Sequence, residues 1–337
     1  MELEPTTLSG VVRLIRDVLR EDYDLDAGPL IRAAGIDEER AEVVGSRISR
    51  HAVMRLWELA IEETGDRNIG LRVGSRVRPT SFHALGIAFL TCDNLRHALE
   101  ALVFFYRVIV TVPLHLKLTD VDDHVELHIR YTNPKYPLPE VPFDSFIASI
   151  VELCRLATKQ EFSPTGLRLR FADNGRAAAY EEYFNAPVVF DPDAEHSAVL
   201  FSRESLETML PGRNVEILDA TDRILEDYVA ALNPDEISSQ VRKLLLTMLP
   251  TGQASQEAIA RKLHMSRSTL QRRLSEENTN YRELLEGTRK TLAIQYVRAS
   301  EHPLSYIAFL LGFSDQSNFS RAFRRWTGVS PKAYQER

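Results

Sequence analysis

The chain has 337 residues, of which 44% are hydrophobic and 26% are charged. This composition excludes wholesale disorder, and the length accommodates about two domains of roughly 100–200 residues. The net charge of −7 is unevenly placed, because residues 236–337 carry 16 Lys/Arg and 9 Asp/Glu, a net of +7, whereas the remainder carries 25 and 39, a net of −14. A basic C-terminal part behind an acidic one predicts that only the former meets a polyanion.

Four N-terminal segments have apolar residues at the spacing of an amphipathic helix. They are residues 8–20, 51–64, 95–108 and 143–158. The apolar stretches at 84–90 and 101–106 are far shorter than the roughly 18 residues that a membrane span needs. We therefore predict no membrane contact.

Between the third and fourth helices the apolar period changes to two, along residues 114–119 and 124–130. The acidic link 120–123 is turn-forming, so the segment predicts a β-hairpin. One register places apolar pairs on one face and an ion pair on the other. Its residue pairs are Leu118–Val125, Leu116–Leu127, Lys117–Glu126 and His115–His128.

Residues 167–171, 188–190 and 198–201 are further short strand candidates. The N-terminal part is therefore predicted to be an α+β domain, with helices around a small, mainly antiparallel sheet. Residues 216–232 predict a long helix, which Asn233, Pro234 and Asp235 end because proline disfavours helix at the preceding residue. We place the domain boundary at this break.

One stripe of this long helix is largely apolar. It consists of Ile217, Thr221, Ile224, Tyr228 and Leu232. The predicted helix spans about two heptads, which are too few to indicate a coiled coil. Ordinary packing and a contact within a homodimer both explain the stripe.

The C-terminal part contains a helix-turn-helix pattern. Residues 256–263 predict a short helix, and residues 267–277 predict a basic amphipathic helix that Ser266 caps and that buries Leu270 and Leu274. A short scaffold helix, a tight turn and a second helix with a polar, basic outer face form this motif.

The pattern recurs about 48 residues later. Residues 304–311 predict the scaffold helix, Gly312 supplies the turn, and Ser314 is predicted to cap a second helix at 315–326. Between the two units, Asn280 opens a connecting helix that runs to about Ala299. This helix would hold the two outer helices at a fixed separation.

The outward side chains suit DNA recognition, because Arg pairs with guanine and Gln or Asn pairs with adenine in the major groove. The predicted base-reading residues are Ser268, Gln271, Arg272, Gln316, Ser317, Asn318, Ser320 and Arg321. The predicted phosphate contacts are Arg267, Arg273, Lys290, Arg324, Arg325 and Lys332, which would set affinity and register rather than sequence preference. The alternative is a structural bundle with a solvated basic face, which two matching units disfavour.

These residues resemble the AraC/XylS family of transcription regulators. The most specific string is residues 307–331, IAFLLGFSDQSNFSRAFRRWTGVSP, and residues 265–274, MSRSTLQRRL, look like the first recognition helix of the family. The resemblance implies that both recognition helices enter successive major grooves. The family often has glycine where His264 and Asn278 stand, but both residue types tolerate left-handed backbone, so we expect the turns to persist.

A weaker resemblance covers roughly residues 10–205. Residues 55–60 (RLWELA), 70–74 (GLRVG) and 180–187 (YEEYFNAP) look like the arabinose-binding-type N-terminal domain of one AraC subfamily, which is not the jelly-roll barrel of the founding member. The resemblance implies effector sensing, contact with RNA polymerase and usually activation. It does not imply that arabinose is the effector.

The predicted organisation has three parts. Residues 1–212 form an effector-sensing regulatory domain, residues 213–234 form a linker helix with a dimer contact as one interpretation, and residues 235–337 form an AraC-type DNA-binding domain with two helix-turn-helix units. The whole is predicted to be an effector-responsive transcription regulator without a cofactor. The alternatives are a constitutive DNA-binding regulator and, as the weakest, an enzymatic N-terminal domain.

Other candidate sites have simpler explanations. His115 facing His128 is compatible with a metal pair, but the sequence offers no third ligand, and a polar sheet face explains both. Arg72, Arg76 and Arg78 could hold an anionic effector, although a solvated or ion-paired surface explains them equally simply. Catalytic motifs such as G-x-S-x-G, a Walker loop or H-E-x-x-H are absent from the sequence.

Two features of the sequence concern the compartment. The chain has two cysteines, Cys92 and Cys154, which are too few for a disulfide framework or a four-cysteine metal site. Both are better explained as buried apolar residues than as redox sensors. The acidic N-terminus does not resemble a secretory signal. We therefore expect a cytoplasmic protein.

Overall fold

A computed structural model of the chain separates into two compact units, one ending at Leu225 and the other beginning at Glu226. The division falls within helix α11 (Val215–Leu232). The helix break expected at residues 233–235 lies outside the described residues. The structure describes residues 4–131, 133, 135–136, 139–159, 162–232, 237–277, 279–327 and 329–335.

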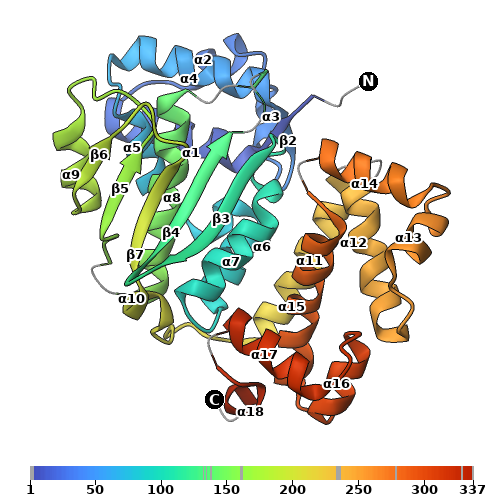
Figure 1. The fold of residues 1–337 in the computed structure, drawn as a ribbon. Coiled ribbons are helices and arrows are strands. Elements are labelled where there is room, and N and C mark those ends of the chain that lie inside the picture. Colours follow the sequence, from blue (N-terminus) through green and yellow to red (C-terminus); the bar gives the residue numbers. More distant parts are fainter. Residues whose placement is uncertain are drawn as a thin grey trace. The chain divides into compact units, whose positions relative to one another are not determined.

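The N-terminal unit is α+β, as predicted, with helices against one face of a five-stranded sheet (Figure 1). The strand order is β3-β4-β7-β5-β6, and only β5 and β6 pair in parallel. The strands of this sheet are β3 (Leu114–Val121), β4 (His124–Tyr131), β5 (Gly166–Leu169), β6 (Val188–Phe190) and β7 (Ser197–Ser202). A separate antiparallel pair consists of β1 (Thr6–Leu8) and β2 (Arg47–Ser49).

Ten α-helices of the N-terminal unit precede α11 among the described residues. They are α1 (Ser9–Tyr23), α2 (Gly28–Ala33), α3 (Glu38–Glu42), α4 (Arg50–Thr64), α5 (Ile69–Ser75), α6 (Ala84–Thr91), α7 (Leu95–Phe105), α8 (Glu140–Thr158), α9 (Ala177–Phe184) and α10 (Arg203–Glu207). The four predicted helices correspond to α1, α4, α7 and α8. The short helices were not predicted, because few turns give too few residues for a periodic pattern.

The predicted hairpin is present, but its register differs from the expected one by two residues. Leu118 pairs with Leu127, and Lys117 pairs with His128. The turn is tighter than expected because strand pairing continues to Val121 and His124, which leaves a two-residue turn in which Asp122 has a φ of 32°. A shift of two preserves the faces of the strands, so the apolar side was predicted correctly while the Lys117–Glu126 and His115–His128 pairs were wrong.

Helix α5 packs closely on α8 through its two glycines. A Cβ atom at Gly74 would lie 2.4 Å from the Ala148 Cβ, and one at Gly70 would lie 2.2 Å from the Val141 carbonyl oxygen. Only glycine therefore permits this helix crossing. The GLRVG string thus has a packing role within the domain.

The C-terminal unit is all-helical, and one hydrophobic core runs through its described residues from Ile237 to Tyr334. Leu270 and Leu274 of the first predicted unit and Phe319 and Phe323 of the second belong to that same core. The helices are α12 (Ile237–Met248), α13 (Gln256–Lys262), α14 (Arg267–Glu276), α15 (Tyr281–Ala299), α16 (Leu304–Leu310), α17 (Gln316–Thr327) and α18 (Pro331–Gln335).

Candidate nucleic-acid interface

The first helix-turn-helix unit consists of α13 and α14. Ile259 and Leu270 are fully buried between them, and the turn passes through His264 at a φ of 55°. His264 therefore adopts the left-handed conformation expected of it, whereas Asn278 lies outside the described residues. The Ser266 hydroxyl accepts a hydrogen bond from the Thr269 N–H at 3.1 Å and caps α14 as predicted.

The second unit consists of α16 and α17, with Ile307, Phe319 and Phe323 fully buried. Gly312 occupies the turn at a φ of 68°. The predicted cap was wrong by one residue, because the Asp315 carboxylate, not the Ser314 hydroxyl, accepts from the Asn318 N–H at 2.7 Å. Hydrogen bonds from the α17 backbone lower the pKa of Asp315, which keeps the cap charged.

The predicted base-reading residues of α14 all lie on its solvent side. Ser268, Gln271 and Arg272 are exposed, and Arg272 forms an ion pair with Glu276 one turn along the helix. Exposed pairs of this kind contribute about 0–1 kcal/mol, so Arg272 can leave Glu276 for a base at little cost. This side of α14 is therefore accessible to a ligand.

The corresponding residues of α17 are less uniform. Gln316, Ser317 and Arg321 are exposed, whereas Asn318 and Ser320 are half-buried. The Asn318 amide donates to Asp315 at 2.6 Å, and its oxygen accepts from Arg321 at 2.6 Å. Asn318 thus orients the Arg321 guanidinium, a role that the residue pattern did not indicate.

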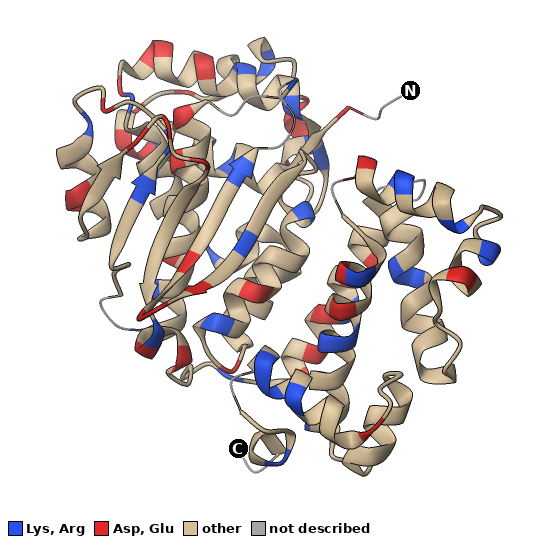
Figure 2. Ribbon diagram, viewed as in Figure 1, with Lys and Arg blue, Asp and Glu red and all other residues tan. Residues whose placement is uncertain are grey.

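The predicted phosphate-contact residues fall into two groups. Arg273, Arg324 and Lys332 are exposed, and Figure 2 shows basic positions on both α14 and α17. By contrast, Arg267 forms an ion pair with Glu257 at 2.8 Å and Arg325 forms one with Glu286 at 2.7 Å. Lys290, which is half-buried, lies on the connecting helix α15.

Glu286 holds the end of the second recognition helix. Its carboxylate accepts from Trp326 Nε1 at 3.1 Å as well as from Arg325. Burial alone would raise the pKa of Glu286, but these two donors outweigh it and lower the pKa. Arg325 is therefore paired with α15, and its side chain, with a relative accessibility of 65%, also remains open to a ligand.

Arg289 holds the turn of the second unit in place, a role that the sequence pattern did not indicate. From α15 its guanidinium donates to the Leu311 and Gly312 carbonyl oxygens, both at 2.7 Å, and stacks on Phe313 at 4.8 Å. Burial lowers its pKa, although an arginine remains charged in any protein. This residue pins the turn of the second unit to the connecting helix, and only the fold brings the two together.

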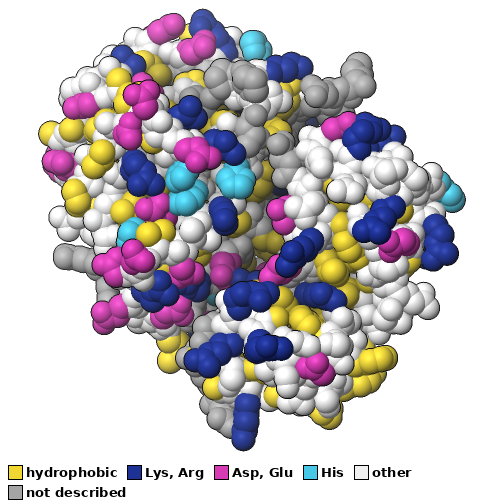
Figure 3. Space-filling model, in the orientation of Figure 1, with side chains coloured by type: hydrophobic (Ala, Val, Ile, Leu, Met, Phe, Trp, Pro, Cys, Tyr) yellow, Lys and Arg dark blue, Asp and Glu magenta, His cyan; other side chains and the backbone are white. Residues whose placement is uncertain are grey.

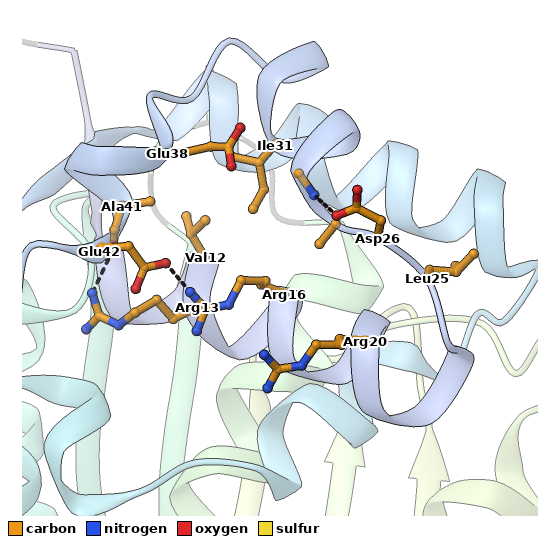
Figure 4. Close-up of a pocket in the computed structure, with 12 residues that line it drawn as sticks. Val12, Arg13, Arg16, Arg20, Leu25, Asp26, Ile31, Glu38, Ala41 and Glu42 are labelled. Atoms are coloured by element: carbon orange, nitrogen blue, oxygen red, sulfur yellow. Dashed lines mark hydrogen bonds and ion pairs between the residues drawn. The ribbon is translucent and has the colours of Figure 1, made fainter.

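A cavity in the N-terminal unit combines basic and acidic side chains. It has a volume of about 220 Å³ and lies between α1, α2 and α3 (Figure 4). It is lined by Arg13, Arg16 and Arg20 of α1 and by Glu38 and Glu42 of α3, and Glu38 forms an ion pair with Arg32 of α2. Arg13 donates to the Ala41 carbonyl oxygen at 2.8 Å, and Arg16 pairs with Glu42.

Two of the three arginines in the predicted basic run have ion-pair partners. Arg72 pairs with Asp66 at 3.1 Å, and Arg76 pairs with Glu21 at 3.2 Å. Cys92 and Cys154 are fully buried, as predicted, and burial raises the pKa of the Cys154 thiol. Within the described ranges, none of the helices has the length and apolarity that crossing a bilayer requires.

Comparisons with known proteins agree with this architecture. Residues 25–210 match the family model of the arabinose-binding domain of AraC transcription regulators, and residues 259–337 match a helix-turn-helix domain. The ornithine utilization regulator of Pseudomonas aeruginosa is 29% identical over 94% of this chain and 92% of its own length. The regulator VirS of Mycobacterium tuberculosis is 28% identical over 98% and 96%.

Among solved structures, the regulator CdpR of Pseudomonas aeruginosa covers 92% of this chain and 96% of its own, with 23% identity and a TM-score of 0.43. The family models match both parts of the sequence in the expected order. Together with the two helix-turn-helix units, they identify a DNA-binding protein rather than an enzyme. The chain belongs to the AraC family of transcription regulators.

Proposed function

We propose that this regulator reads a bipartite DNA site with α14 and α17 and that a small molecule bound in the N-terminal unit controls its action. The first part rests on one observation: α14 and α17 each expose a polar face while their apolar faces belong to the same hydrophobic core. Ser268, Gln271 and Arg272 would read one major-groove segment, with Gln316, Ser317, Asn318, Ser320 and Arg321 reading the next. Arg267, Arg273, Lys290, Arg324, Arg325 and Lys332 would contact phosphates.

The cavity between α1, α2 and α3 supports the second part. Guanidinium groups bind carboxylates in fixed geometry, and Glu38 and Glu42, which now pair with Arg32 and Arg16, would exchange these partners for the ammonium group of a ligand. We therefore propose a small zwitterion, such as an amino acid, as the effector class. The name of the ornithine utilization regulator, one of the relatives, makes ornithine the first compound to test.

Thermal unfolding of the full-length protein with ornithine, other amino acids and arabinose tests this proposal. A ligand at about 100 times its Kd stabilises the folded protein by about 2.7 kcal/mol, so the Tm should rise. Arg16→Gln should remove the rise, whereas Arg55→Gln, which alters an exposed ion pair on α4, should retain it. If no zwitterion or carboxylate shifts the Tm and DNA affinity is constant throughout, the constitutive alternative is correct.

We further propose that the protein activates transcription through RNA polymerase in the cytoplasm, and that it pairs as a homodimer through α11. Ile217 and Ile224, seven residues apart on α11, are about half exposed, whereas Thr221 of the predicted stripe is buried. Sedimentation of the full-length protein tests the dimer: Ile217→Lys with Ile224→Lys should reduce its mass to that of a monomer. Transcription in vitro with and without the protein distinguishes activation from repression.

A further inference from the structure

The solvent face of the N-terminal sheet carries a cluster of imidazole and carboxylate groups. Side chains alternate along β4, so His124, Glu126 and His128 share the face opposite the buried Val125 and Leu127. His196 directly precedes β7, the neighbour of β4. Figure 3 shows histidine side chains on the surface over this sheet, beside acidic and basic ones.

The strand register brings His196 to the other two residues. Because His128 pairs with Ala198, His196 is its diagonal neighbour on the same face. The two imidazole rings overlap with their centroids 3.8 Å apart. One donor atom each of Glu126, His128 and His196 lies within 4.8 Å of those of the other two.

We propose that Glu126, His128 and His196 form a binding site for one transition-metal ion of the Zn²⁺ class. Two imidazoles and a carboxylate are a common ligand set for Zn²⁺, Ni²⁺, Co²⁺ and Fe²⁺. Tetrahedral ligands with bonds of about 2.0–2.1 Å lie roughly 3.3 Å from one another, so small side-chain rotations complete the geometry. Solvent supplies the fourth ligand at this surface.

Each ligand is positioned by its neighbours. His124 Nε2 lies 3.2 Å from Glu126 Oε1, which leaves Oε2 directed at His128 Nε2, 2.7 Å away. The ion takes the place of the proton in this second contact, so the bound His128 carries its proton on Nδ1.

His196 presents a lone pair to the centre of the cluster. Its Nε2 lies 3.5 Å from Arg168 Nη2, and a guanidinium can only donate hydrogen bonds. The neutral imidazole is the form that binds a metal ion.

Arg168 is the competitor of the ion. The same Nη2 atom lies 3.0 Å from Glu126 Oε2 and thus occupies the space between two of the three donor atoms. The side chain is about one-third exposed, with a relative accessibility of 35%, so it can swing into solvent. Metal binding therefore displaces the Arg168 guanidinium, and removal of this side chain should strengthen binding.

The proposal is tested by calorimetric titration of Zn²⁺ into tag-free, full-length protein, with Co²⁺ absorption as a report on coordination geometry. We expect one equivalent of metal. His196→Ala, His128→Ala and Glu126→Gln should each lower the affinity about 10-fold or more. Arg168→Met should raise it, and the affinity should fall as the pH falls, because protons compete for the ligands.

His115→Ala is the matched control, because His115 lies on the same sheet face of the adjacent strand β3 and is outside the cluster. Its affinity for Zn²⁺ should equal that of the unmodified protein. Thermal unfolding in a chelator verifies that each variant folds, and Zn²⁺ should then raise the Tm of every variant that binds it. The proposal would be overturned if the His196→Ala and His128→Ala variants bound Zn²⁺ as tightly as the unmodified protein, or if neither the unmodified protein nor Arg168→Met bound it.

Discussion

The guanidinium groups of Arg272 on α14 and Arg321 on α17 are held by different kinds of partner. Arg272 is exposed and, among the described contacts, is held by the intrahelical Glu276, whereas Arg321 is oriented by Asn318. A pre-oriented guanidinium loses less conformational freedom when it binds a base. We therefore expect Arg321 to discriminate between bases at least as strongly as Arg272.

Alanine substitution tests these base contacts on sites selected from a random DNA pool. Arg272→Ala and Arg321→Ala should each lose about 1–3 kcal/mol of binding free energy for the selected site and should relax its sequence preference. Lys332→Ala, which removes an exposed charge, should weaken binding to all sequences alike. An equal loss on selected and random DNA would show that Arg272 reads no base.

At the same scale, Asp144 is a structural residue of the N-terminal unit. It is fully buried, its carboxylate pairs with Arg176, and it accepts from the Tyr180 hydroxyl. Asp144→Ala removes the nearer carboxylate from the buried Arg176 guanidinium, which keeps Glu140 at 3.5 Å and Asn68 at 2.8 Å, and should reduce the free energy of unfolding by about 3 kcal/mol. Urea denaturation measures this change, with Glu58→Ala, which removes an exposed partner of Arg55, as the comparison that should cost much less.

At the scale of elements, one carboxylate connects the end of α14 to the start of α12. Both oxygens of Glu277 accept hydrogen bonds, from the Ile237 and Ser238 N–H groups, at 2.8 Å. Nothing in the local sequence indicates this contact, since the partners are about 40 residues apart. This contact fixes the start of α12 to the end of α14.

Glu277→Ala should destabilise the C-terminal unit by about 1–2 kcal/mol, because it leaves buried N–H groups at a helix N-terminus without an acceptor. Glu276→Ala is the matched control, since the adjacent Glu276 is exposed and pairs only with Arg272 among the described contacts. Urea denaturation of the two variants should give the larger loss for Glu277. A similar loss in both would mean that the cap contributes nothing.

The comparison of sequence and structure also belongs at this scale. Long helices such as α4 and α8 were predicted because several turns repeat the apolar spacing. The hairpin was predicted but its register was not, because Leu118 has apolar partners at both Val125 and Leu127, and the tight turn at Asp122 decides between them. The prediction of the capping residue of α17 failed for a similar reason, since Ser314 and Asp315 are both residue types that cap helices well.

The candidate site was predicted as far as local patterns extend. The outward faces of α14 and α17 follow from helical periodicity, so the exposure of Arg272 and Arg321 was predicted correctly, and their base contacts stay a prediction. Arg289 and Glu277 act across long sequence separations, and His196 joins Glu126 and His128 only through strand pairing. Such partners depend on tertiary structure, which a single sequence does not specify locally.

At the scale of the whole molecule, each unit has a core of its own. The buried cluster of the C-terminal unit is formed among residues from Ile237 onward, and this part of the chain is basic whereas the remainder is acidic. A fragment that begins at Glu226 should therefore fold and bind DNA by itself. Its affinity should fall steeply with salt concentration, because phosphate contacts release counterions.

The central claim is that one chain engages two DNA segments at once. Helix α15 has 19 residues and connects the two helix-turn-helix units, which share one hydrophobic core. Neither α14 nor α17 can therefore rotate independently of the other. Successive major grooves on one face of DNA recur about every 10–10.5 base pairs. The two boxes of one site should consequently tolerate base changes between them far better than insertions.

The most direct test is the affinity of the fragment beginning at Glu226 for a selected site with five extra base pairs between its two boxes. This insertion rotates one box by about half a turn. The account predicts that one recognition helix then releases the DNA, so that affinity falls toward that of a site with a single box, and that ten extra base pairs do not restore it. Unchanged affinity for the five-pair insertion would contradict the account, because it would mean that only one of the two units engages DNA bases.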